Sequence, residues 1–279
     1  MDIAVNSGYF RRKYEGGERT DLACARLCRQ GGFSYIDCSP GCIEEEDWQS
    51  RAATLAEGLH KEGITVIQSH APFNRYRREP EDVFREKLRR AFHTAAILGA
   101  RHIVIHADEY VCPPGEYDSE AACRYAYEFF APFVELAQNL GIGVAVENLF
   151  EDRPGQGRSR CTSTVEEIRR ILELFHTPTV GCCWDFGHAA TAFGGGMLTE
   201  LEKIAPAVTC THVHDNYLNG DLHLPLFLGK TDWRPQIGCL RSVGYPGFFT
   251  YEFVYGCMPE EVIPSFLHFQ REAALALLR

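Results

Sequence analysis

Two hydrophobic patterns alternate along the whole chain. Short apolar runs, rich in β-branched and aromatic residues, are each followed by a stretch in which apolar residues recur with the period of a helix. The short runs are apolar at nearly every position, which is typical of strands buried on both faces of a parallel sheet. The predicted strands cover residues 3–5, 33–38, 64–69, 102–106, 144–148, 180–185, 208–212 and 248–253.

The stretches between the strands carry helix signals. Glycines at 31–32, 63, 99 and 141 follow the first four helical patterns and predict where those helices end. Pro132 predicts a kink in the fourth helix, and Ser163 and Glu166 have the spacing of a capping box that opens the fifth. The predicted helices include residues 22–27, 47–61, 84–98, 119–140, 168–175 and 198–204, a segment after Trp233, and 259–278.

Eight strand–helix pairs in succession predict an α/β protein, a single (β/α)₈ TIM barrel. The length of 279 residues suits one such barrel, and no linker or composition change divides it, so residues 1–279 are expected to form one domain. A doubly wound open sheet is the alternative. It would normally carry a glycine-rich phosphate turn after the first strand, where this chain has Asn6-Ser7-Gly8.

Composition narrows the function further. The net charge is −10, and the densest basic cluster, at residues 75–90, is interleaved with acidic residues, so nucleic acid is not an expected partner. No apolar run approaches the roughly 20 residues that span a bilayer, so no membrane association is expected. The N-terminus shows no secretory signal, and the twelve cysteines form no CxxC pair. These features predict a cytoplasmic protein with free thiols.

Metal-binding residue types recur where the predicted strands end. In this fold the C-terminal ends of the strands form the active-site mouth. Buried carboxylates gathered there would repel one another and would be costly to desolvate, and a divalent cation resolves both problems. Imidazole and carboxylate together suit zinc, manganese, iron or cobalt. The residues concerned are His70, His106, Glu147, Asp185, His188, His212, His214, Asp221, His223 and Glu252.

The order of these residues resembles the xylose isomerase-like barrel superfamily of sugar isomerases and epimerases, which also contains the endonuclease IV group of repair enzymes. The resemblance covers nearly the whole chain and rests on short segments at successive strands. They are His70-Ala71-Pro72, Val146-Glu147-Asn148, Trp184-Asp185-Phe186-Gly187-His188, His212-Val213-His214-Asp215, Asp221-Leu222-His223-Leu224-Pro225, Gly229-Lys230-Thr231-Asp232-Trp233 and Tyr251-Glu252-Phe253.

The resemblance implies one divalent metal held by four residues: Glu147, Asp185, His212 and Glu252. It implies that His188 binds substrate or a further metal. His214 either touches substrate or holds a ligand in place.

Four more residues match the extra ligands of the repair-enzyme branch, which uses three metals. These residues are His70, His106, Asp221 and His223. Either the chain holds two or three metals, or these residues contact substrate hydroxyls around a single metal. The single-metal interpretation is favoured because sugar-active relatives often keep some of these residues.

The favoured function is isomerisation or epimerisation of a small polyhydroxy carbonyl substrate through an enediolate, with Glu147 and Glu252 as base and acid. A lyase acting on an inosose- or dehydroshikimate-type substrate shares the first proton abstraction and is the first alternative. An endonuclease IV-like multinuclear phosphodiesterase is the second, disfavoured by the net charge. A binding module without catalysis is less favoured. The expected partner is a sugar-like small molecule, and relatives often form homo-oligomers.

The family pattern is not followed everywhere. Many relatives have a Pro-Gly-x-Gly turn before the Asp-Trp pair, where this chain reads Pro225-Leu226-Phe227-Leu228-Gly229. Ketohexose 3-epimerases carry an arginine after the seventh-strand histidine, and this chain has Asn216 and Tyr217 there, which argues against ketohexose specificity. Aromatic residues that follow strand ends either wall a pocket or pack the rim. They are Tyr9, Phe10, Phe73, Phe150, Phe186 and Phe227.

Overall fold

Eight parallel strands form one sheet in a computed structural model that describes residues 1–75, 77–113, 115–151, 157–218, 220–253 and 258–279. From β1 to β7 each strand pairs with the next one in the chain, and β8 pairs with β1. The strands are β1 (Asp2–Asn6), β2 (Tyr35–Asp37), β3 (Thr65–His70), β4 (His102–Ile105), β5 (Gly143–Glu147), β6 (Val180–Asp185), β7 (Val208–His212) and β8 (Phe248–Tyr251).

The sheet closes between β7 and β8. Val213, directly after β7, forms a parallel bridge with Tyr251. Its backbone N–H donates to Thr250 at 2.8 Å, and its carbonyl accepts from the N–H of Glu252 at 3.0 Å. The closed ring of strands confirms the predicted (β/α)₈ barrel. It also brings the ends of β5 to β8 to one mouth, as the fold requires.

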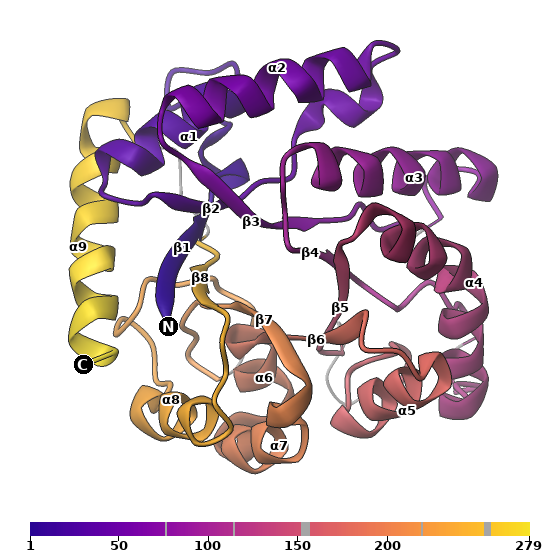
Figure 1. Cartoon of the computed structure of the whole chain (residues 1–279). Helices are drawn as coiled ribbons and strands as arrows, with labels where there is room; N and C mark the ends of the chain where they lie inside the picture. Colours follow the sequence, from indigo (N-terminus) through magenta and orange to yellow (C-terminus); the bar gives the residue numbers. More distant parts are fainter. Residues whose placement is uncertain (76, 114, 152–156, 219, 254–257) are drawn as a thin grey trace.

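The helices surround the strands as an outer layer (Figure 1). They are α1 (Asp21–Gln30), α2 (Trp48–Lys61), α3 (Glu81–Ile97), α4 (Ser119–Leu140), α5 (Val165–Phe175), α6 (Phe186–Phe193), α7 (Met197–Ile204), α8 (Trp233–Ser242) and α9 (Ile263–Leu277). The main core lies between this layer and the strands. A separate buried cluster of small side chains fills part of the barrel interior: Val104, Ala145, Cys183 and Cys210.

Two local features differ from the sequence prediction. Thr164, not Ser163, is the N-cap of α5, and its side chain makes no capping hydrogen bond to the backbone of the described helix. Its hydroxyl donates to Glu167 Oε2 at 3.2 Å. The Ser163 hydroxyl instead donates to the Arg160 carbonyl at 2.8 Å. Helix α6 was not predicted, since Asp185 is both the last residue of β6 and the N-cap of α6, so no turn residues separate the two elements.

Three further expectations concern the fourth helix, the cysteines and membrane-spanning segments. The helix α4 continues through Pro132 to Leu140 and ends at Gly141, whose φ of 71° lies in the left-handed region that glycine favours. None of the described cysteines forms a disulfide. Within the described ranges, no helix is both long and apolar enough to cross a bilayer.

Candidate metal centre

The last four strands place the predicted metal ligands side by side. Glu147 ends β5, Asp185 ends β6, His212 ends β7, and Glu252 follows β8. The register pairs Asp185 with His212 directly across β6 and β7. One ligand atom from each of the four residues lies within 4.8 Å of the others, and all four side chains are buried. The structure therefore brings together the whole tetrad.

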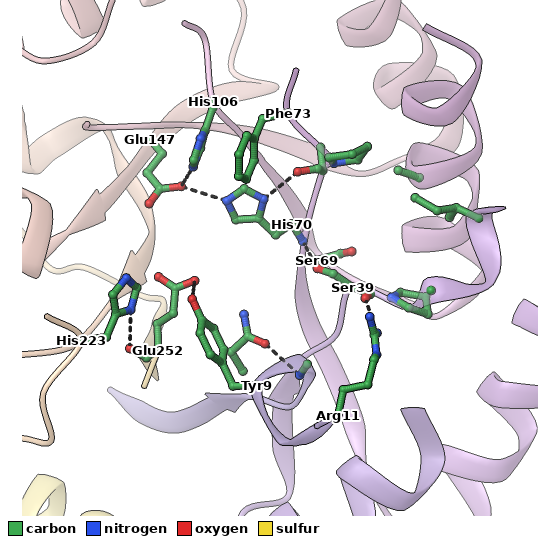
Figure 2. Close-up of a pocket in the computed structure, with 18 of the residues that line it drawn as sticks. Tyr9, Arg11, Ser39, Ser69, His70, Phe73, His106, Glu147, His223 and Glu252 are labelled. Atoms are coloured by element: carbon green, nitrogen blue, oxygen red, sulfur yellow. Dashed lines mark hydrogen bonds and ion pairs between the residues drawn. The ribbon is translucent and has the colours of Figure 1, made fainter. Parts of the chain in front are cut away.

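Glu147 is also the meeting point of two further histidines. Its Oε2 lies 3.0 Å from His70 Nε2 and 3.1 Å from His106 Nε2 (Figure 2). Its Oε1 lies 3.1 Å from His212 Nδ1 and 3.2 Å from His188 Nδ1. One carboxylate thus links the tetrad to a second group of candidate ligands, formed by His70, His106 and Glu147.

A third group of candidate ligands adjoins Asp185. It consists of His188, His214, Asp221 and His223. Asp221 Oδ2 lies 3.1 Å from His223 Nε2 and 3.6 Å from His188 Nε2. His214 is fully buried, with Nε2 3.1 Å from the Asp185 carboxylate and its ring stacked on His223 at 3.8 Å. His214 therefore contacts the Asp185 carboxylate and does not line the cavity.

The hydrogen bonds of three histidines test whether a cation fits this centre. Nδ1 of His70, His188 and His223 lies 2.7, 2.9 and 3.0 Å from a backbone carbonyl oxygen, which can only accept. Each neutral ring therefore carries its hydrogen on Nδ1 and presents a lone pair at Nε2. For His70 and His223 that lone pair faces a carboxylate oxygen at about 3 Å, an arrangement that needs a proton or a metal cation between them.

The electrostatics favour positive charge in the same place. Burial by itself would lower the pKa of the His188 imidazole, but the Asp185 and Asp221 carboxylates raise it well above its usual value. Burial would raise the pKa of Glu147, but the charge of His212 and hydrogen bonds from neighbouring imidazoles bring it well below its usual range. The cluster thus stabilises either imidazolium protons or a divalent cation, and its nitrogen and oxygen donors suit zinc, manganese, iron or cobalt.

The centre opens into a cavity of about 640 Å³ at the barrel mouth. Tyr9 lies at its wall, and its hydroxyl donates to Glu252 Oε1 at 3.0 Å (Figure 2). Phe73 stacks on the His106 ring at 4.6 Å. Of the six aromatic candidates, Tyr9, Phe73 and Phe150 line the cavity, while Phe10 and Phe186 belong to the core and Phe227 is exposed.

Asp37, at the end of β2, is a residue that the sequence prediction missed. Its Oδ2 lies 3.5 Å from His212 Nε2 on the side away from the cavity and accepts from Gln68 Nε2 at 2.9 Å. A carboxylate behind a metal-ligating histidine fixes its ring and raises its basicity. The sequence signal that could have revealed Asp37 was its position near the end of a predicted strand, but the rest of that strand is largely apolar.

These residues and this fold define a (β/α)₈ barrel with a centre suited to divalent metal at its mouth. The sequence matches the model of the xylose isomerase-like TIM barrel family over residues 25–273, and the chain belongs to that family.

Individual relatives show how far the similarity extends. Protein y4fM of Sinorhizobium fredii is 26% identical over 99% of this chain and 94% of its own length. A D-tagatose 3-epimerase-like protein superposes with a TM-score of 0.76 at 20% identity, over 100% of this chain and 98% of its own. The 3-keto-D-glucoside 4-epimerase YcjR of E. coli gives 0.70 at 16%, over 97% and 98%. The IolI protein, solved with a zinc atom, gives 0.75 at 15%, over 100% and 98%.

Proposed function

We propose that this chain is a divalent-metal-dependent isomerase or epimerase of a small polyhydroxy carbonyl compound. One observation carries the proposal: Glu147 and Glu252 belong to the same group of candidate metal ligands and line the same cavity. They come from β5 and β8, on different sides of the barrel. The sugar epimerases among the structural neighbours support this reaction class.

The ligands assigned to the metal are Glu147, Asp185, His212 and Glu252. A divalent cation held by these residues would supply Lewis acidity toward a carbonyl substrate. Nitrogen and carboxylate donors of this kind are found in catalytic zinc and related sites.

The two glutamates divide the proton transfers. One removes the proton next to the substrate carbonyl, and the other returns a proton, so in an epimerase each is the base in one direction and the acid in the other. Tyr9 holds the Glu252 carboxylate through its hydroxyl. His188, which also lines the cavity, orients a substrate oxygen through Nε2.

In this proposal the remaining residues of the cluster contact substrate hydroxyls around one metal. They are His70, His106, Asp221 and His223, and all four line the cavity. His214 does not line it, and its contact with Asp185 gives it a positioning role.

Solvent exchange tests the proposal. The purified protein is incubated in D₂O with a panel of ketoses, aldoses and inososes, and proton NMR follows the hydrogen next to each carbonyl. At least one substrate should exchange that hydrogen and form an isomer, and Glu147→Gln and Glu252→Gln should abolish the reaction. Glu128→Gln is the matched control, since Glu128 is exposed on α4 and does not line the cavity. Exchange with loss of water would instead identify a lyase, and no exchange with any substrate contradicts the proposal.

A second candidate, a multinuclear phosphoester hydrolase, is favoured by one observation. Of the three candidate ligand groups at the barrel mouth, two share Glu147 and the third adjoins Asp185, an arrangement that suits neighbouring cations sharing carboxylates. Hydrolysis of bis(p-nitrophenyl) phosphate by the metal-loaded protein, lost in His106→Ala, would support this candidate over the first.

A further inference from the structure

A buried asparagine joins two segments of the chain at the barrel mouth. Asn216 is fully buried and does not line the cavity. Its Nδ2 donates to the Gly187 carbonyl at 2.7 Å and to Thr191 Oγ1 at 3.3 Å, and its Oδ1 accepts from the Leu222 N–H at 2.6 Å. Because a carbonyl only accepts and an N–H only donates, this link needs a side chain with both a donor and an acceptor.

The two backbone groups bonded by this amide are next to candidate ligands. Gly187 directly precedes His188 in α6, and Leu222 lies between Asp221 and His223. Asp221 Oδ2 lies 3.1 Å from His223 Nε2 and 3.6 Å from His188 Nε2, and all three side chains line the cavity. The amide therefore connects the backbones of the same two segments whose side chains meet at the cavity wall.

The backbone of His223 depends on such contacts. Its φ of 45° lies in the left-handed region, which is unfavourable for a residue with a Cβ and persists only where neighbouring contacts impose it. On one side Leu224 pairs with Asp215 through two backbone hydrogen bonds of 2.7 and 2.9 Å. On the other side Leu222 bonds the Asn216 amide. The first contact ties the loop to its own start, and the second ties it to α6.

His214 lies directly behind this loop. It is fully buried, and its ring stacks on the His223 ring at 3.8 Å. Its Nδ1 lies 3.8 Å from Asp221 Oδ1 and has no hydrogen-bond partner among the described residues. A shift of the loop away from α6 would uncover this nitrogen, so its chemical reactivity reports where the loop lies.

We propose that Asn216 is a positioning residue for substrate binding. It holds Asp221 and His223 against His188, so that the three side chains contact the substrate together, and it touches the substrate itself at no point. The contacts of the three side chains with substrate rest on the proposed function, whereas the position of the loop does not.

Two variants separate the two ends of the link. Asn216→Ala removes both bonds, and Asn216→Asp has the same shape and keeps the acceptor but loses the donor to Gly187. Asn74→Ala is the matched control. Asn74 is also a buried asparagine, and its amide donates to the Glu79 carbonyl at 2.9 Å and accepts from the Glu79 N–H at 3.2 Å, outside the main cavity.

Limited modification with diethyl pyrocarbonate, read by peptide mass spectrometry, tests the position of the loop without turnover. It is carried out on the proteins as purified, well below their unfolding temperatures. His214 should stay protected in the wild type and in Asn74→Ala. In both Asn216 variants it should react about fivefold faster or more, the effect of one lost hydrogen bond on local opening.

Kinetics test the role in substrate binding, with a substrate that exchanges its hydrogen in D₂O. Both Asn216 variants should raise KM about tenfold and change kcat less than about threefold, because they weaken contacts made equally in the ground state and the transition state. A merely structural defect would lower the fraction of active protein and so reduce kcat alone. Asn74→Ala should leave KM unchanged.

Three results overturn the inference: His214 stays protected in both Asn216 variants, it reacts equally fast in Asn74→Ala, or Asn216→Asp behaves like the wild type. Faster modification of His214 with unchanged KM would reject the role in substrate binding and leave the proposed reaction intact. The proposed function fails separately. Faster modification of His214 in a protein that exchanges no substrate would keep the position of the loop and reject the reaction.

Discussion

Asp37→Asn tests how the barrel interior supports the metal centre. The substitution keeps the size and the hydrogen bond from Gln68 but removes the negative charge 3.5 Å from His212 Nε2. Loss of the partner behind a ligating histidine typically weakens metal binding 10- to 100-fold. Because 3.5 Å is longer than a hydrogen bond, we expect the lower end, about tenfold or about 1.4 kcal/mol.

Zinc affinity is measured by competition with a fluorescent chelator, and thermal unfolding is followed on metal-free protein. Asp37 Oδ1 is buried without a partner among the described residues, so the metal-free variant should unfold at the same temperature or higher. Ser7→Ala is the control, since the Ser7 hydroxyl donates to the Asp37 backbone carbonyl and leaves the carboxylate intact. Unchanged zinc affinity in Asp37→Asn would refute the reasoning.

Three further predictions concern single contacts. A Cβ added at Gly187 would lie 1.8 Å from the His214 ring, so Gly187→Ala should lower the free energy of unfolding by about 1–3 kcal/mol, and His214→Ala should relieve most of that loss in the double variant. Burial raises the pKa of Glu109 to about 7, so the folded protein loses stability as the pH rises from about 4.5 to 7. In urea unfolding, the free energy of unfolding of Glu109→Gln should match that of wild type near pH 4 and exceed it by up to about 3 kcal/mol at pH 8. Equal free energies at pH 8 would contradict this prediction. Tyr9→Phe removes only the hydroxyl that holds Glu252, so it should lower the rate of substrate hydrogen exchange in D₂O about tenfold without changing zinc affinity. A parallel loss of zinc affinity would show that the hydroxyl supports the metal instead.

Much of the fold could be predicted because its signals are local. Each strand is a continuous apolar run, and each of the first four helices ends near a glycine. The eightfold alternation then leaves few topologies, and chain order alone puts Glu147, Asp185 and His212 at neighbouring strand ends. The tetrad is brought together because parallel strands share one mouth.

The sequence prediction misplaced element boundaries at two sites: between β6 and α6, where one residue belongs to both elements, and at the start of α5. Asp185 ends β6 and caps α6 through the His188 N–H at 2.6 Å, so the pattern shows no loop between the two elements. Ser163 and Thr164 are both cap-forming residues, and only tertiary contacts decide between them. The Ser163 hydroxyl lies 2.8 Å from both the Glu151 carboxylate and the Arg160 carbonyl, and Thr164 occupies the N-cap position.

Contacts between distant segments could not be read from the pattern. Asp37 approaches His212 across the barrel interior, and nothing near Asp37 in the sequence indicates that partner. Residues of the 3-10 helix η2 (Gly41–Glu44) and of α3 both line the cavity, and no local pattern marks them as cavity residues. Such features depend on packing among segments more than 40 residues apart.

Metal content measured by elemental analysis is the most direct test of the proposed centre. The wild type, Glu147→Gln and His106→Ala are purified without added metal. We expect about one zinc, manganese, iron or cobalt per chain, lost in Glu147→Gln and kept in His106→Ala. Two or three metals per chain, reduced in His106→Ala, would contradict the single-metal isomerase and favour the hydrolase. Absence of metal, with no uptake when it is added, would contradict the centre itself.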